Sequence, residues 1–99
     1  MKVYLDDTRQ EPEGYVRTYW PDETIVLLET GEVTHLSLDH DLGDDERGTG
    51  YDVLLWLEQA VATQDFIPPQ EIVIHSANTS ARHKMQLAIQ SIRRFEAMP

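Results

Sequence analysis

The chain has 99 residues, and its 18 acidic against 8 basic side chains give a formal net charge of −10 at pH 7. This length suits one small domain, and we expect residues 1–99 to form it. Such an acidic surface repels nucleic-acid phosphate and argues against binding to duplex DNA. The chain has no cysteine, which excludes disulfides and thiolate catalysis. No apolar run approaches the roughly 20 residues that span a bilayer. No secretory signal is recognisable, so we expect a cytoplasmic protein.

The apolar pattern predicts strands and helices that alternate along the chain. In chain order we expect a strand at 2–5, a loop at 8–14, a strand at 15–19, a helix from 21 to the glycine at 31, a strand at 33–38, a loop at 43–50, a helix at 51–62, a strand at 71–75 and a long helix that contains residues 81–95. This alternation favours an α/β sandwich around a mostly parallel sheet. The connection between the first two strands is too short for the crossover helix that parallel neighbours normally need. We therefore expect residues 15–19 to pair differently or to contribute little.

Polar side chains gather where three of the predicted strands end. They are Asp6 and Asp7 after the first strand, Asp39, His40 and Asp41 after a middle strand, and His75, Ser76 and Asn78 at the end of the last strand. In open parallel sheets, functional groups gather beyond the carboxyl ends of the strands. We therefore expect these three groups to form one site.

The acidic residues of this predicted site favour a bound cation. Two carboxylates about 4 Å apart repel each other by about 4 kcal/mol at an effective dielectric constant near 20. A shared proton or a cation would offset this cost, and oxygen ligands favour Mg²⁺, with Mn²⁺ or Ca²⁺ as alternatives. The candidate ligands are Asp6, Asp7, Asp39 and Asp41. Alternatively, Asp6 and Asp7 only cap a loop, an interpretation that the two further acids disfavour.

Other side chains near the strand ends suit phosphate and proton transfer. Ser76 can donate its hydroxyl to a phosphate oxygen, or it can cap the start of the last helix, which would itself attract an anion. Arg9 is a candidate to bind phosphate or to pair with an Asp. His40 and His75 can act as general acid or base near neutral pH. A histidine at a strand end is, however, more often a structural hydrogen-bonding residue.

The order of these motifs resembles a known family. The arrangement of Asp6-Asp7, Asp39 and Ser76 resembles the receiver domain of two-component signalling. Four stretches look like a divergent branch, the cyclic-phosphate processing receiver domains, and together they span nearly the whole chain: residues 4–9 (YLDDTR), 37–43 (SLDHDLG), 48–52 (GTGYD) and 75–78 (HSAN). The resemblance implies a compact, truncated, flavodoxin-like three-layer sandwich with about four mostly parallel strands.

The resemblance also implies roles for the site residues. Asp6, Asp7 and Asp39 would hold Mg²⁺, Asp39 would accept a phosphoryl group in an ordinary receiver, and Ser76 would contact the phosphate. The lysine that follows a fifth strand in receivers has no counterpart here, which disfavours phosphorelay. His40, Asp41, His75 and Asn78 are what a hydrolytic site would use instead, with Asn78 beside the phosphate.

The implied activity is metal-dependent opening of a cyclic phosphate, on an RNA end in repair or on a nucleotide. His40 or His75 would move the proton, and Asp39 would either hold the metal or attack directly. Two alternatives remain open: a non-enzymatic receiver module that is phosphorylated on Asp39 and switches a protein partner, and an acidic interaction or inhibitor protein. The clustering of acids and other polar groups at three strand ends argues against the last.

Overall fold

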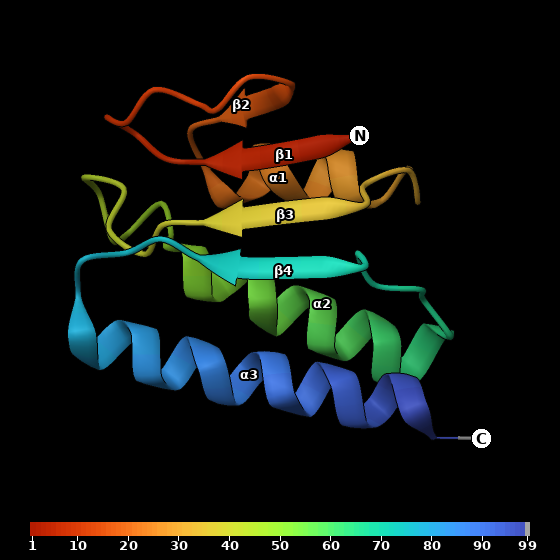
Figure 1. Cartoon of the computed structure of the whole chain (residues 1–99). Coiled ribbons are helices and arrows are strands. Elements are labelled where there is room, and N and C mark those ends of the chain that lie inside the picture. The colour runs from red at the N-terminus through yellow and green to blue at the C-terminus, as the bar shows by residue number, and fades with distance from the viewer. Residues whose placement is uncertain (99) are drawn as a thin grey trace.

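A computed structural model describes residues 1–98 as one sheet of four parallel strands and three helices (Figure 1). The elements are β1 (Lys2–Leu5), β2 (Tyr15–Thr18), α1 (Pro21–Leu28), β3 (His35–Leu38), α2 (Gly50–Gln64), β4 (Glu71–Ile74) and α3 (Thr79–Ala97). The strands lie in the order β2-β1-β3-β4. The prediction of a receiver-like α/β fold with about four parallel strands is confirmed. No helix of the described residues is long and apolar enough to cross a membrane.

The pairing of β2 differs from the expectation. β2 lies parallel to β1, with Lys2 opposite Tyr15 and Leu5 opposite Thr18. Because both strands have only four residues, the connecting chain has to travel back only about 13 Å. Residues 6–14 cover that distance without a helix, since even partly extended chain spans about 3 Å per residue. The backbone N–H of Asp6 also donates to the carbonyl of Thr18 at 3.1 Å, which extends the pairing towards the site.

The direction of the crossovers decides how the helices are layered. The connections β2–α1–β3 and β3–α2–β4 step across the sheet in the same direction, so right-handed crossovers place α1 and α2 on the same face. α3 packs beside α2 and adds Met85, Ala88 and Ile92 to the same core. The β1–β2 connection steps the opposite way but contains no helix. The described residues therefore form a sheet and one helical layer, whereas the resemblance to receiver domains implied a three-layer sandwich.

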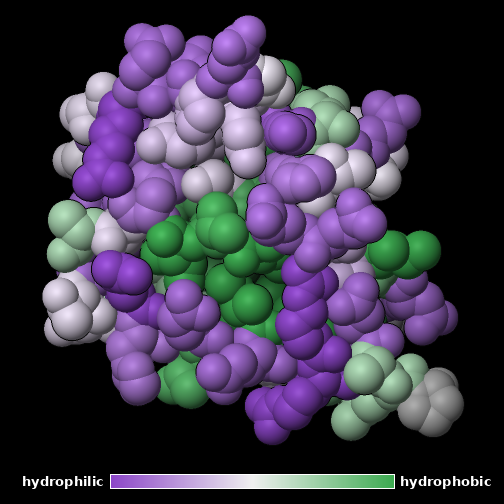
Figure 2. Space-filling view, in the orientation of Figure 1, coloured by the Kyte–Doolittle hydropathy of each residue, from purple (hydrophilic) through white to green (hydrophobic). Residues whose placement is uncertain are grey.

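Alternation along the strands sorts the side chains between the two faces. Val3, Leu5, Leu36 and Leu38 are at most 1% exposed and belong to the single core cluster under the helices. The intervening residues lie on the other face, which no helix covers in residues 1–98. There Tyr4 and Ser37 are nonetheless buried, whereas Val73 is 41% exposed. Figure 2 shows apolar surface near the middle of the molecule, around the region of β4, with polar residues around it.

Local hydrogen bonds start each helix close to the carboxyl ends of the strands. The Glu23 carboxylate accepts the N–H groups of Tyr19 and Trp20 at the start of α1. Asp52 accepts the N–H of Thr49 at the start of α2. Asn78 caps α3 by accepting the N–H of Ala81 at 3.1 Å. Such caps satisfy N–H groups that have no partner within the helix, and they fix the loops that carry the candidate site.

Candidate functional site

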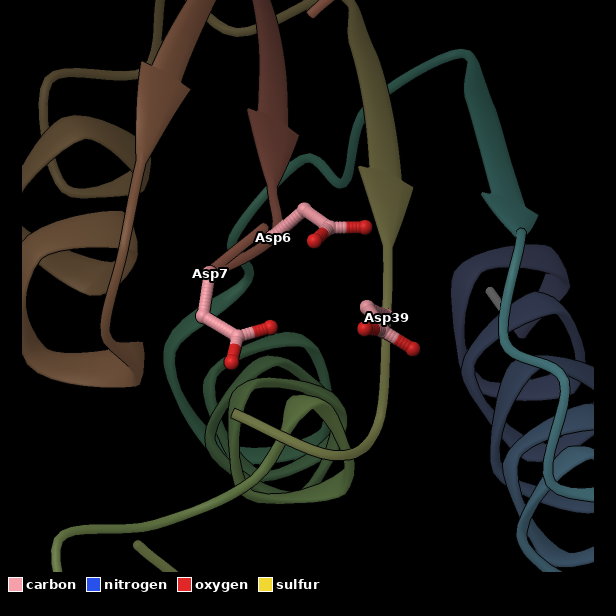
Figure 3. A group of neighbouring side chains, drawn as sticks. All are labelled: Asp6, Asp7 and Asp39. Atoms are coloured by element: carbon pink, nitrogen blue, oxygen red, sulfur yellow. The ribbon is translucent and has the colours of Figure 1, made fainter. Parts of the chain in front are cut away.

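Three carboxylates converge where β1 and β3 end (Figure 3). Asp6 and Asp7 directly follow β1, and Asp39 directly follows β3. Each offers an oxygen atom that lies within 4.8 Å of the others. β1 and β3 are paired in register, with Leu5 opposite Leu38, so the residues that follow them must emerge side by side. The predicted cluster at the strand ends is therefore present in the structure.

Asp6 is held rigidly from several sides. Its side chain is fully buried, and Oδ1 accepts the backbone N–H groups of Thr8 and Arg9 at 2.8 and 2.9 Å. Its Oδ2 lies 2.9 Å from Nε2 of His75. Burial by itself favours the neutral acid, but the two N–H donors and His75 outweigh it and hold the pKa of Asp6 below its ordinary value. Asp6 is therefore a fixed, ionised carboxylate.

Asp39 has the opposite electrostatic character. Its Oδ1 accepts the N–H of His40 at 2.8 Å, and the side chain of Ser76 also helps to stabilise the charge. Burial and the negative charge of Asp6 nevertheless raise the pKa of Asp39 above its ordinary value. A carboxylate that is this unfavourably charged gains most when a cation or a proton arrives. Asp39 therefore differs from Asp6 in that its charged form is stabilised by a positive partner more than by its present neighbours.

Asp41 was predicted as a fourth ligand, but within residues 1–98 it lies outside the group that could hold one ion. Its Oδ1 is 2.8 Å from Nδ1 of His40, and its Oδ2 accepts a hydrogen bond from the Asn78 amide at 3.4 Å. The bond to His40 lowers the pKa of Asp41, so this carboxylate is ionised and can only accept. In the neutral ring of His40, Nδ1 therefore carries the proton and Nε2 has the lone pair.

His75 differs from His40 because both of its ring nitrogens are engaged. Nδ1 lies 2.8 Å from the Ser37 hydroxyl and Nε2 lies 2.9 Å from Asp6. The ring also stacks on Tyr4, with centroids 4.3 Å apart and planes 3° apart. Burial lowers the pKa of His75 in spite of the neighbouring Asp6. A proton-shuttling role, as the sequence suggested, would require His75 to break one of these bonds.

The residues predicted to bind phosphate are placed in different ways. Ser76 is 3% exposed, and its hydroxyl accepts the N–H of Asn78 at 3.1 Å. The same side chain stabilises the charge on Asp39. Asn78 serves as the cap of α3 and contacts Asp41. Arg9 donates from Nη1 to the carbonyl of His75 at 2.6 Å, which ties the loop after β1 to the end of β4. Of these three side chains, that of Ser76 is the one that contacts a carboxylate of the acidic cluster, while Arg9 contacts Asp6 through its backbone N–H.

Two glycines and a serine contribute to the site, although the sequence assigned no role to any of them. A Cβ on Gly50, the first residue of α2, would collide with the backbone carbonyl of Asp39. Gly43 has φ +92°, a left-handed conformation, and lies against the Asp7 carboxylate. Ser37 sits inside β3 and bonds His75. All three residues lie in the motif stretches 37–43 and 48–52, but a motif does not show that Ser37 reaches His75.

The donor set suits a hard divalent cation. Three carboxylate oxygens within 4.8 Å of each other form a concentration of negative charge that water alone stabilises poorly. Carboxylates are ligands of Mg²⁺ and Ca²⁺, and Mg²⁺ typically uses one or two of them while keeping several waters. The chain therefore has a receiver-like sheet whose strand ends carry an acidic cluster that fits a divalent metal ion.

Comparison with known families agrees with this arrangement. Residues 1–91 match the family described as the Cyclic-phosphate processing Receiver domain. The chain belongs to this family, as the motifs of the sequence indicated. Searches among curated proteins and among solved structures returned no significant match.

Proposed function

We propose that this protein hydrolytically opens cyclic phosphates, on RNA ends or on nucleotides, at a Mg²⁺ site formed by Asp6, Asp7 and Asp39. The observation that carries the proposal is the convergence of these three carboxylates in a chain of the cyclic-phosphate processing family. A bound divalent ion would neutralise negative charge on the phosphodiester and favour attack at phosphorus. Mn²⁺ or Ca²⁺ are the alternatives for the same oxygen ligands.

The chain's own residues would supply proton transfer and orientation. Water adds to phosphorus, one phosphorus–oxygen bond of the ring breaks, and the released sugar oxygen takes up a proton. His40 is the better-suited proton carrier of the two histidines, because Asp41 holds Nδ1 while Nε2 has no hydrogen-bond partner among residues 1–98. Ser76 is buried beside Asp39 and would orient the phosphate. His75 has no free ring nitrogen, which supports a different role for it.

The test compares the parent with Asp39→Asn, incubated with Mg²⁺ and a short oligoribonucleotide that ends in a 2′,3′-cyclic phosphate. Chromatography separates cyclic, opened and dephosphorylated ends. The matched control is Asp65→Asn, because Asp65 lies at the other end of α2 and already has a left-handed backbone that Asn accepts. We expect turnover by the parent and by Asp65→Asn, and none by Asp39→Asn. Full activity of Asp39→Asn would refute the proposal.

A receiver switch is the second candidate, favoured by the β2-β1-β3-β4 parallel sheet with Asp39 after β3. It predicts stoichiometric labelling of Asp39 by a small acyl-phosphate donor, without multiple turnover of any cyclic phosphate. An acidic inhibitor of a protein partner, by contrast, would spread its charge over one face, and single changes at Asp6, Asp7 or Asp39 would do little.

A further inference from the structure

We infer that His75 is a positioning residue: its ring, held by Ser37 and Tyr4, fixes the Asp6 carboxylate in the orientation that it presents to a metal ion. This inference rests on the proposed metal site and assigns to His75 a role other than proton transfer. It concerns contacts between β1, β3 and β4 that the family motifs do not reveal.

The hydrogen bonds around Asp6 leave one arrangement of the His75 ring. Asp6 already accepts two backbone N–H groups on Oδ1, so it acts as an ionised, acceptor-only carboxylate. Nε2 of His75, 2.9 Å from Oδ2, must therefore be the donor. In a neutral ring, Nδ1 is then the acceptor, and the Ser37 hydroxyl at 2.8 Å donates to it. The chain of donors runs from Ser37 through His75 to Asp6.

The ring is fixed in position as well as in tautomer. It lies flat on Tyr4, with 4.3 Å between the centroids, and the backbone carbonyl of His75 accepts from Arg9. Its side chain is 15% exposed and that of Asp6 is fully buried. The two backbone N–H groups hold Oδ1, and within residues 1–98 His75 is the one donor to Oδ2, which has no solvent to replace a lost partner. The contact joins the end of β4 to the end of β1, two strands that are separated in the sheet by β3.

Replacing a residue that orients a metal ligand without touching the metal typically lowers metal affinity or activity about 10- to 100-fold. We expect His75→Phe, which keeps an aromatic ring on Tyr4 but has no donor, to bind Mn²⁺ at least about 10-fold more weakly than the parent. His75→Gln places an amide N–H at nearly the position of Nε2 and should restore most of the affinity. Isothermal titration and the electron paramagnetic resonance of free Mn²⁺ measure both without requiring turnover.

The tautomer gives a second, independent measurement on the parent protein. Two-bond ¹H–¹⁵N correlation spectra of the histidine rings should show His75 protonated on Nε2 and unprotonated on Nδ1. This readout stands even if His75→Phe does not fold, and thermal denaturation of each variant shows whether it does. A ring protonated on Nδ1, or a mixture of the two tautomers, would overturn the inference.

The outcomes separate this inference from the proposed function. Unchanged Mn²⁺ affinity in His75→Phe, or a loss in His75→Gln as large as in His75→Phe, overturns the positioning role and leaves the metal site intact. Failure of the parent itself to bind Mn²⁺ overturns both. If the parent binds Mn²⁺ and shows the expected variant pattern but opens no cyclic phosphate, the positioning role holds and the hydrolytic function fails.

Discussion

Replacing Asp39 with Asn should stabilise the metal-free protein while abolishing its response to Mg²⁺. Asp39 carries a carboxylate oxygen within 4.8 Å of oxygens from Asp6 and Asp7. One such pair repels by about 3.5 kcal/mol at an effective dielectric constant of 20, and by about 1 kcal/mol in bulk water. Because Asp39 is partly exposed, the true relief lies towards the lower value. Asn keeps the oxygen that accepts the N–H of His40, so little else is lost.

The expected gain is easily measured by thermal denaturation in a chelator. For a domain of this size, 1 kcal/mol corresponds to a rise in Tm of about 4–8 °C. Asp45→Asn is the matched control, since Asp45 is an exposed loop acid and its replacement removes the same charge from a chain of net charge −10. Adding Mg²⁺ should raise the Tm of the parent and of Asp45→Asn but leave Asp39→Asn unchanged. A Tm of Asp39→Asn at or below that of the parent in chelator would refute the claim that repulsion in this cluster is strong.

Three further results are expected. Gly50→Ala should unfold the start of α2 or displace the Asp39 backbone, seen as a fall in Tm of more than 10 °C, roughly 2 kcal/mol or more; a Tm like that of the parent would contradict this. Asp41→Ala should lower kcat with metal affinity intact, because Asp41 orients His40; weaker Mn²⁺ binding in titration would instead return Asp41 to the metal site. Chemical denaturation in chelator should show stability falling as the pH drops below 6.5, because the unfolded chain protonates His75 there while the folded protein, with its lowered pKa, resists. The lowered pKa of Asp6 adds a second loss of stability as the pH falls below 3.8. The raised pKa of Asp39 acts in the opposite sense, as the pH falls towards 3.8 from above. Stability that rises on acidification from pH 7 to about 6, where His75 dominates, would contradict the assignment.

The sequence by itself determined which elements form and which edge of the sheet carries the site. A short apolar run placed the strand at Lys2–Leu5 with the bounds that the structure has. Helical periodicity predicted the long terminal helix, observed as α3. Because the carboxyl ends of parallel strands share an edge, the positions of Asp6, Asp7 and Asp39 were sufficient to predict their convergence. The family motifs pointed to the same residues. Each motif is a contiguous run of the sequence, so it can be recognised without knowledge of the fold.

Only the tertiary structure decided which polar neighbours actually meet. Asp39 and Asp41 are two residues apart, yet one joins the cluster and the other bonds His40 and Asn78. His40 and His75 look equivalent in sequence, and their separate environments come from Asp41 in one case and from Ser37 and Asp6 in the other. The layering likewise depended on the direction of each crossover, which local sequence does not encode. The physical reason is common to all three: sequence patterns specify which face a residue takes in its own element, while contacts across strands depend on register and on loop geometry.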